Sequence, residues 1–430
     1  MRRSFLVLQG PASPFFEVLC AMLLARRHIV RRVNFCGGDV AYSGKEPAWN
    51  YAGASSDLAF WYSDVLSTGD FSDVLMFGDC RAIHRPVHVV AQSLGVRVHV
   101  FEEGYVRPNW ITLEPFGVNG RSMLPLDPTW YRERRETNPP GQPTGYSLQI
   151  RAWHDIHYRM ANALHAWRFP NYRSHRPYNG FVEYAGLANR FARLSRYKAE
   201  ARRVASALVT ERRPYYLFPL QLNSDSQIIE HSPFSGIREV ISKVLHSFAD
   251  HAPSDALLVV KNHPLDTGLI GSHRQVRSLA GQLGMADRVR YIEAGHLPTL
   301  LERARGVVVV NSTVGLSALH HDRPLMTLGA AVYSMPGMTW QGSLDDFWQR
   351  AESPDAALYQ AFIDYVIRHT QINGDFYSRS GIAMAAAGAV SRLEAATSPF
   401  AVGQTSLSSE SSILPQQHML PPQLKEAARG

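Results

Sequence analysis

The chain has 430 residues, 45% of them hydrophobic and 19% charged, a balance that suits two or three globular domains and argues against disorder or a fibrous structure. Lys and Arg number 44 against 37 acidic residues, so the net charge of +7 favours anionic partners. Three cysteines without metal-ligand spacing support neither a disulfide framework nor a zinc site. Apolar runs are too short for a signal peptide or a membrane span, so we expect a cytoplasmic protein.

The first 125 residues alternate short β-rich runs with helical patterns. Predicted strands cover 4–8, 29–34, 74–77 and 96–101, and predicted helices cover 15–26, 60–66 and 83–94. Such alternation is typical of a parallel sheet with helices on both faces.

A second alternation runs from about 215 to 328. Its predicted strands are 215–219, 257–261, 289–292, 307–310 and 324–328, and apolar residues at helical spacing predict a helix over 237–248. We therefore expect an α/β enzyme with two Rossmann-like, doubly wound domains facing a central cleft. The expected divisions are an acceptor domain over 1–203, a donor domain over 204–345, helices over 346–395 and a disordered tail over 396–430.

The stretch between the two alternations, 127–203, is basic and aromatic. From 151 to 203 there are eleven Lys and Arg residues against three acidic ones, with ten aromatic residues interleaved. This composition predicts a helical surface that meets anionic lipid headgroups. The alternative is a helical linker whose basic face is simply solvated.

Polar residues gather where the predicted strands end, which is where open parallel sheets bind ligands. These residues are Glu102, Glu103, Gln221, Asn223, Asp225, Ser226, His263, Pro264, Asn311, Ser312 and Thr313. Because side chains alternate along extended backbone, we expect one of Glu102 and Glu103 to enter the cleft as a general acid or base, and the sequence leaves open which. Arg107 is positioned to hold an acidic substrate group.

His263 and Pro264 place an imidazole at the end of a strand, where it can donate to a phosphate. Ser312 and Thr313 precede a predicted helix, so hydroxyls and backbone N–H groups can converge on a phosphate there. No GxxxxGK[ST] or GxGxxG motif occurs, and no acidic pair resembles a metal-bridged diphosphate site. The sequence therefore predicts no metal and no separate cofactor.

Eight short stretches together resemble the capsule polysaccharide biosynthesis/export family, in particular its KpsS/LipB branch. They are LQGPASPFF (8–16), NFCGGD (34–39), FGDCRAIHRP (77–86), VFEEGYVRPNWITLE (100–114), PLQLNSDSQI (219–228), NHPLD (262–266), VNSTVGLSAL (310–319) and LDDFW (344–348). The likeness covers about residues 4 to 350.

The resemblance implies a retaining β-Kdo transferase of GT-B-like fold that uses CMP-Kdo and a phosphatidylglycerol-type lipid acceptor. It also implies peripheral contact with the inner face of the inner membrane and a role beside a capsule export complex. Glu102, Glu103 and Gly104 match the family's acidic motif, His263 and Pro264 its HP motif, and Ser312 and Thr313 its hydroxyl motif. Gln9, Gly10 and Arg81 lie in matched stretches and are added as substrate-binding candidates, and Asp225 is the expected second carboxylate.

Two other functions compete with this one. A non-catalytic membrane adaptor of capsule export would use the basic aromatic stretch without releasing CMP. A nucleotide-sugar epimerase would share the two-domain fold, but a soluble substrate gives no reason for a lipid-facing surface. Nucleic-acid binding fits poorly, because no basic helix or single-strand-binding module accompanies the charge.

Overall fold

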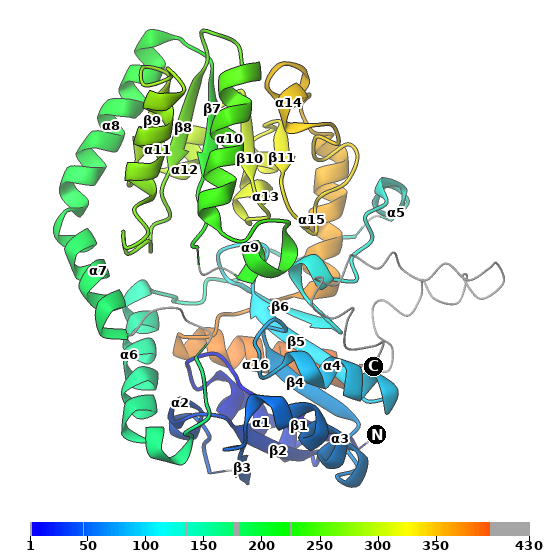
Figure 1. The fold of residues 1–430 in the computed structure, drawn as a ribbon. Helices are drawn as coiled ribbons and strands as arrows, with labels where there is room; N and C mark the ends of the chain where they lie inside the picture. Colours follow the sequence, from blue (N-terminus) through cyan, green and yellow to red (C-terminus); the bar gives the residue numbers. More distant parts are fainter. Residues whose placement is uncertain (1, 46, 135, 175–179, 224–225, 396–430) are drawn as a thin grey trace, which may run out of the picture. The chain divides into compact units, whose positions relative to one another are not determined.

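Two β-sheets organise the chain in the computed structural model, which describes residues 2–45, 47–134, 136–174, 180–223 and 226–395 (Figure 1). The first sheet has the strand order β12-β6-β5-β4-β1-β2-β3, and the second has the order β11-β10-β7-β8-β9. Both lie in one compact unit, Met1–Leu393. The two helix-flanked sheets, one mostly parallel and one wholly parallel, confirm the predicted α/β, GT-B-like class. The predicted tail, 396–430, is outside the described residues.

The first sheet is parallel except at one edge. Its strands are β1 (Ser4–Val7), β2 (Ile29–Asn34), β3 (Ala48–Asn50), β4 (Asp73–Phe77), β5 (Arg97–Glu103), β6 (Trp110–Pro115) and β12 (Gln371–Asn373). Strand β6 pairs antiparallel with β5, and β12 pairs antiparallel with β6. The sequence did not predict β3, β6 or β12. Strand β6 follows β5 after a connection too short for a parallel crossover, so the chain returns antiparallel.

Alternating apolar residues of β1 reach both faces of this sheet. Phe5 and Val7 join a core formed with α1 (Phe15–Ala25) and α16 (Arg379–Glu394), whereas Leu6 and Leu8 join a core formed with α3 (Leu58–Thr68) and α4 (Arg85–Ser93). A strand buried on both faces needs such a continuous apolar run, which is why its sequence predicted it well.

The second sheet is wholly parallel. Its strands are β7 (Tyr215–Pro219), β8 (Leu257–Lys261), β9 (Val289–Ile292), β10 (Gly306–Val309) and β11 (Leu325–Thr327). The helix predicted over 237–248 is α10 (Ile237–His251), and its apolar stripe packs in one core with α11 (Ser272–Gln282) and α14 (Leu344–Arg350). The other helices of this part are α9 (Ser226–His231), α12 (Leu297–Leu301) and α13 (Val314–His320).

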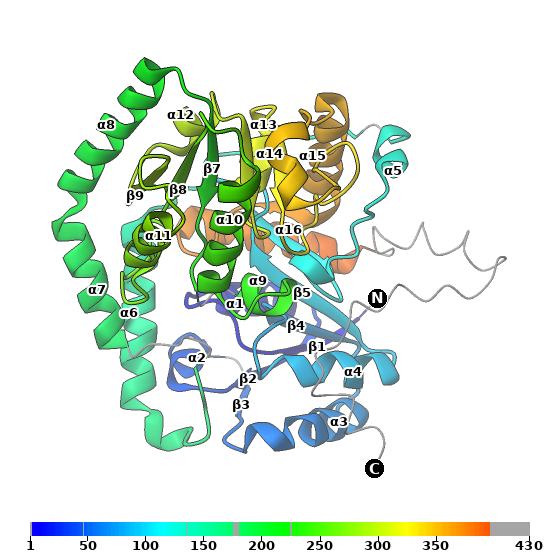
Figure 2. The ribbon, with the colours of Figure 1, turned by 45° about the horizontal axis from the view of Figure 1, so that its top comes forward.

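Helices of the middle stretch follow one another along one side of the molecule (Figures 1 and 2). They are α6 (Leu148–Leu164), α7 (Gly180–Ala192) and α8 (Leu194–Glu211). Two short helices, α2 (Gly37–Ala41) and α5 (Pro128–Arg132), and the longer α15 (Ala356–Thr370) complete the α-helices of the described residues. Among those residues, no helix combines the length and apolarity needed to cross a bilayer.

Candidate functional site

The acidic motif ends strand β5 rather than following it. The sequence predicted a strand that stops at Phe101, but Glu102 pairs with Thr112 and Glu103 pairs with Ile111 of β6. The antiparallel neighbour extends β5 over both carboxylates. Because side chains alternate along a strand, the two carboxylates point to opposite faces, as expected.

Glu103 is held by two partners from distant parts of the chain. The Tyr377 hydroxyl donates to Glu103 Oε1 over 2.9 Å, and Arg151 Nη1 of α6 lies 3.3 Å from the same oxygen. A carboxylate with an arginine and a phenol on one oxygen is well suited to anchoring and poorly suited to accepting a substrate proton. Glu103 therefore ties α6 and the segment before α16 to the end of β5.

Glu102 has the properties of a general base. The pKa of its carboxyl is raised to about 7, mainly by burial and also by neighbouring Glu103 and Asp79, while the Glu103 backbone N–H and Arg81 oppose the shift. Its Oε1 accepts the Glu103 backbone N–H over 2.9 Å. A Cβ atom at Gly78 would lie 3.5 Å from Glu102 Oε2 and 3.8 Å from Arg81 Nε, so the glycine leaves the space between them open. A carboxyl that titrates near neutral pH can take a proton from a hydroxyl.

Arg81, Gln9 and Gly10 form one group next to Glu102. Arg81 Nη1 donates to Gln9 Oε1 over 2.8 Å and to the Gly10 carbonyl over 3.1 Å. Gln9 Nε2 in turn donates to Asp39 Oδ2 over 3.0 Å, and the Tyr158 hydroxyl of α6 donates to Asp39 Oδ1 over 2.7 Å. The structure thus brings these three predicted residues together, and α6 supports them from behind.

The HP motif presents a neutral imidazole. Leu265 N–H donates to His263 Nδ1 over 3.1 Å, which leaves Nε2 as the protonated nitrogen. The pKa of His263 is lowered to about 4, mainly by burial and also by four cations: Lys261, Arg190, Arg107 and Arg151. His263 therefore donates as a neutral group near pH 7. Pro264 contributes its carbonyl, which accepts Arg190 Nε over 3.0 Å.

The cations around His263 come from both halves of the chain. Arg107 precedes β6, where its Nε donates to the Gly104 carbonyl over 3.1 Å, and Lys261 is the buried last residue of β8. Arg190 pairs with Glu293 at 2.7 Å and Arg151 pairs with Glu103. Within the described ranges Lys261 and Arg107 have no ion pair, so their charges remain for an anionic ligand.

The predicted hydroxyl motif is built around a buried amide pair. Gln221 Nε2 donates to Asn311 Oδ1 over 3.0 Å, and Gln221 Oε1 accepts the Asn311 backbone N–H over 3.2 Å. These two side chains therefore join the ends of β7 and β10. Ser312 Oγ accepts Val314 N–H over 3.2 Å at the start of α13, and Thr313 lines a small pocket with Tyr105 and Tyr333.

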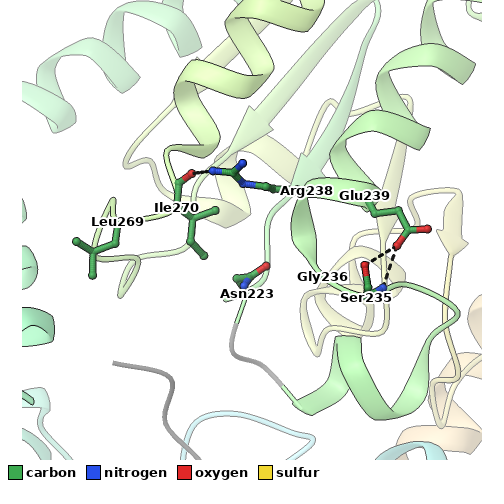
Figure 3. A pocket seen from close by; sticks show the side chains of 7 residues that line it. All are labelled: Asn223, Ser235, Gly236, Arg238, Glu239, Leu269 and Ile270. Atoms are coloured by element: carbon green, nitrogen blue, oxygen red, sulfur yellow. Dashed lines mark hydrogen bonds between the residues drawn. The ribbon is translucent and has the colours of Figure 1, made fainter. Parts of the chain in front are cut away.

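Asn223 lines a pocket that Glu102 does not line. Its Oδ1 accepts the Ile237 N–H over 3.0 Å, and it lines a space of about 380 Å³ between the segments that follow β7 and β8. Figure 3 shows Arg238 reaching across this pocket to the Ile270 carbonyl, a hydrogen bond of 2.7 Å. Asp225 is outside the described residues, and Ser226 is the first residue of α9.

Comparison with known proteins places the chain in a family. The model of the family described as capsule polysaccharide biosynthesis protein matches residues 72–377. The chain belongs to this family. It is 35% identical to the capsule polysaccharide export protein KpsS of Escherichia coli over 382 residues, which cover 87% of this chain and 97% of that protein.

Further relatives agree with that assignment. The capsule polysaccharide modification protein LipB of Neisseria meningitidis is 32% identical over 386 residues, which cover 87% of this chain and 92% of LipB. Among solved structures, KpsC of Thermosulfurimonas dismutans, a β-Kdo 2,7 transferase, is similar over 84% of this chain and 89% of its own, at 15% identity and a TM-score of 0.38.

Sequence patterns did not indicate four residues of the site: Lys261, Arg151, Arg190 and Tyr377. Lys261 had a usable signal, because a lysine that ends an apolar strand two residues before His263 is placed at a ligand-binding edge. Arg190 was expected on the exposed basic surface and is instead 7% exposed, with its guanidinium on Glu293 and Pro264. Tyr377 and Arg151 are identified only by the contacts that folding creates.

The pKa of Glu102 predicts a pH dependence. If Glu102 accepts the acceptor's proton, it must be ionised, so the rate should rise about tenfold per pH unit below 7 and level off above it. Initial rates from pH 5.5 to 9 would measure this limb. Glu114 is the control, because burial also raises its pKa to about 7 while Tyr105 and Ser122 hold it inside the protein. If the rise of the rate with pH disappeared in Glu114→Gln but remained in Glu102→Gln, Glu102 would not be the general base.

Proposed function

We propose that this protein is a retaining β-Kdo glycosyltransferase, which moves Kdo from CMP-Kdo to a phosphatidylglycerol-type lipid and so starts the linker of a capsule polysaccharide. The observation that carries the proposal is that the two adjacent carboxyls at the end of β5, Glu102 and Glu103, have different surroundings. Glu103 pairs with Arg151 and accepts a hydrogen bond from Tyr377, while Glu102 has a pKa of about 7 and faces Arg81. Membership in the capsule polysaccharide family supports the substrate class.

The transfer breaks the bond between the anomeric carbon of Kdo and the phosphate oxygen of CMP, and it forms a bond from that carbon to the acceptor oxygen. Glu102 takes the acceptor hydroxyl's proton, and CMP departs with the bonding electron pair. Arg81 and Arg107 are proposed to hold the carboxylate of Kdo or the acceptor phosphate. Retention needs either a front-face route or a second carboxylate, for which Asp225 is the proposed residue.

The leaving CMP is proposed to bind at the HP motif. His263 Nε2–H and the Lys261 ammonium can both donate to its phosphate, and Ser312 and Thr313 add hydroxyls. A monophosphate leaving group carries less charge than a diphosphate, so these donors suffice and we propose no catalytic metal. The product phosphate stays close to the cations that lower the pKa of His263.

Release of CMP tests the proposal against its competitors. Purified protein with CMP-Kdo should release CMP faster when a phosphatidylglycerol analogue is added. A membrane adaptor releases none, and an epimerase would instead change the stereochemistry of a nucleotide-linked sugar without an acceptor. Acceptor-independent release at the same rate would also count against a transferase, because it would indicate hydrolysis of the donor.

We also propose that the protein attaches to the inner face of the inner membrane through α6 and α7. On α6 the outward side chains are apolar and exposed, with Trp153 at 62%, Leu164 at 70% and Trp167 just beyond the helix at 78%. They follow helical spacing with Ile156 and Met160. The next helices add Phe181 and an exposed cationic set that consists of Arg193, Arg196, Lys198, Arg202 and Arg203. Apolar side chains beside cations suit an anionic bilayer surface.

This attachment predicts a change in vesicle binding. Trp153→Ser combined with Leu164→Ser should move most of the protein out of the floating fraction in flotation with phosphatidylglycerol vesicles, since each large side chain contributes about 1.5–3 kcal/mol on burial. The matched control is Phe60→Ser on α3, a phenylalanine that is 80% exposed but lies outside this surface. Flotation of the α6 variant equal to that of the control would refute the proposed surface.

A further inference from the structure

Three metal-ligating side chains from the two halves of the chain meet beside the candidate site. Asp79 and Cys80 follow β4 of the first sheet, and His231 ends α9 next to the second sheet. Cys80 Sγ lies 3.2 Å from Asp79 Oδ1 and 3.3 Å from His231 Nε2. A tetrahedral zinc ion with bonds of about 2.3 Å to sulfur and about 2.0 Å to nitrogen separates such ligands by about 3.5 Å.

The two oxygens of Asp79 have different surroundings. Oδ2 accepts the Val118 backbone N–H over 3.4 Å and lies 3.8 Å from Arg121 Nη1, whereas Oδ1 faces the thiol. Asp79 Oδ2 is thus held by groups outside the cluster, and Oδ1 points toward the thiol. Carboxylates that bind metals are commonly fixed by such a hydrogen bond on the other oxygen.

The charges around this cluster nearly balance. Arg121 Nη2 also lies 3.6 Å from Glu230 Oε2, and Arg85 pairs with Glu230. Arg121 therefore contacts both Asp79 and Glu230, and Arg85 contacts Glu230.

The His231 ring lies close to the backbone of the short segment that contains Gly120. A Cβ at Gly120 would lie 2.6 Å from His231 Nδ1, so only glycine allows the backbone to approach the ring this closely.

We propose that Asp79 Oδ1, Cys80 Sγ and His231 Nε2 bind a zinc-type divalent ion. One thiolate, one imidazole nitrogen and one carboxylate oxygen are donors that zinc prefers. On binding, the Cys80 thiol loses its proton to solvent and the sulfur bonds the metal. His231 is fixed to the second half, because its carbonyl accepts Ala330 N–H over 2.7 Å and Asn311 Nδ2–H over 3.3 Å.

The ion would therefore join the loop after β4 to α9, close to Arg81. This site is independent of the proposed transferase activity and needs no substrate. The sequence could not predict it, because 151 residues separate Cys80 from His231.

Cobalt binding to the full-length, untagged protein tests the site. After treatment with a chelator, Co²⁺ should produce the near-ultraviolet charge-transfer band of a cobalt thiolate and the visible bands of a tetrahedral ion, and Zn²⁺ should displace both. Cys80→Ser should abolish the thiolate band. His231→Asn should weaken Co²⁺ binding by about 10- to 100-fold or more, since even loss of a residue that only supports a ligand has that effect. Zinc content after purification should fall in parallel.

Cys20→Ala is the matched control, because Cys20 is buried in the core of the first sheet and should leave the spectrum unchanged. Circular dichroism checks that each variant folds. If Cys80→Ser does not fold, the Co²⁺ spectrum of the chelator-treated natural chain tests the proposal instead. Absence of a thiolate band in the natural chain would overturn the proposal and leave only a network of thiol hydrogen bonds. So would a zinc content in Cys80→Ser and His231→Asn that equals that of the natural chain.

Discussion

Replacing Glu102 by Gln is expected to lower turnover of Kdo transfer by about 100-fold or more, with little change in CMP affinity. The amide keeps the size of the side chain and removes the group that accepts the proton, a loss that costs about this much when a general base is replaced. Initial rates with CMP-Kdo and a lipid acceptor would measure the effect, and calorimetry would measure the affinity.

Glu103→Gln is the matched comparison, since it makes the same chemical change one residue away. Its amide can still contact Tyr377, and loss of the partly exposed ion pair with Arg151 should lower turnover less than about tenfold while reducing thermal stability. Equal and mild losses in both variants would remove the general base from the account. A larger loss for Glu103 would exchange the two roles.

Replacing Lys261 by Met should weaken CMP binding by about 10- to 150-fold, the effect of losing one hydrogen bond between charged groups. Methionine fills the same buried space at the end of β8 without the ammonium. Lys243→Met on α10 is the control, because that lysine is exposed and distant in the fold from the HP motif. Calorimetric titration with CMP compares the three proteins.

His263→Ala and Ser312→Ala should each weaken CMP binding by a smaller factor than Lys261→Met, because both donors are neutral. If all three variants bind CMP like the natural chain, the phosphate does not sit at the HP motif. The pocket lined by Asn223 and Arg238 would then be the next place to locate the nucleotide.

Strands with continuous apolar runs were predictable from sequence, whereas the antiparallel edge of the first sheet was not. β1, β7 and β8 are buried on both faces, so their composition alone identifies them. β12 has three residues and forms only because α15 and α16 bring it beside β6. That edge determines the geometry of the site, because pairing with β6 extends β5 through Glu102 and Glu103.

The sequence indicated the site residues that lie at strand ends, but not the contacts that join residues far apart in the chain. The prediction that Glu102 and Glu103 face opposite ways depended only on strand geometry, and which one is free depended on Arg151 and Tyr377. Arg190 shows the opposite error, because a basic helix pattern cannot reveal that one arginine turns inward to Glu293. Gln221 and Asn311 hydrogen-bond each other in a buried pair, which no sequence pattern indicated, and their contact with substrate stays a prediction.

Mass spectrometry of the lipid product tests the central claim most directly. Purified protein, CMP-Kdo and a fluorescent phosphatidylglycerol analogue in vesicles should produce a lipid that is heavier by the mass of one or more Kdo units, with equimolar CMP, and Glu102→Gln should produce almost none. A lipid of unchanged mass under conditions in which the protein binds both CMP and the vesicles would contradict a Kdo transferase and would favour the non-catalytic adaptor.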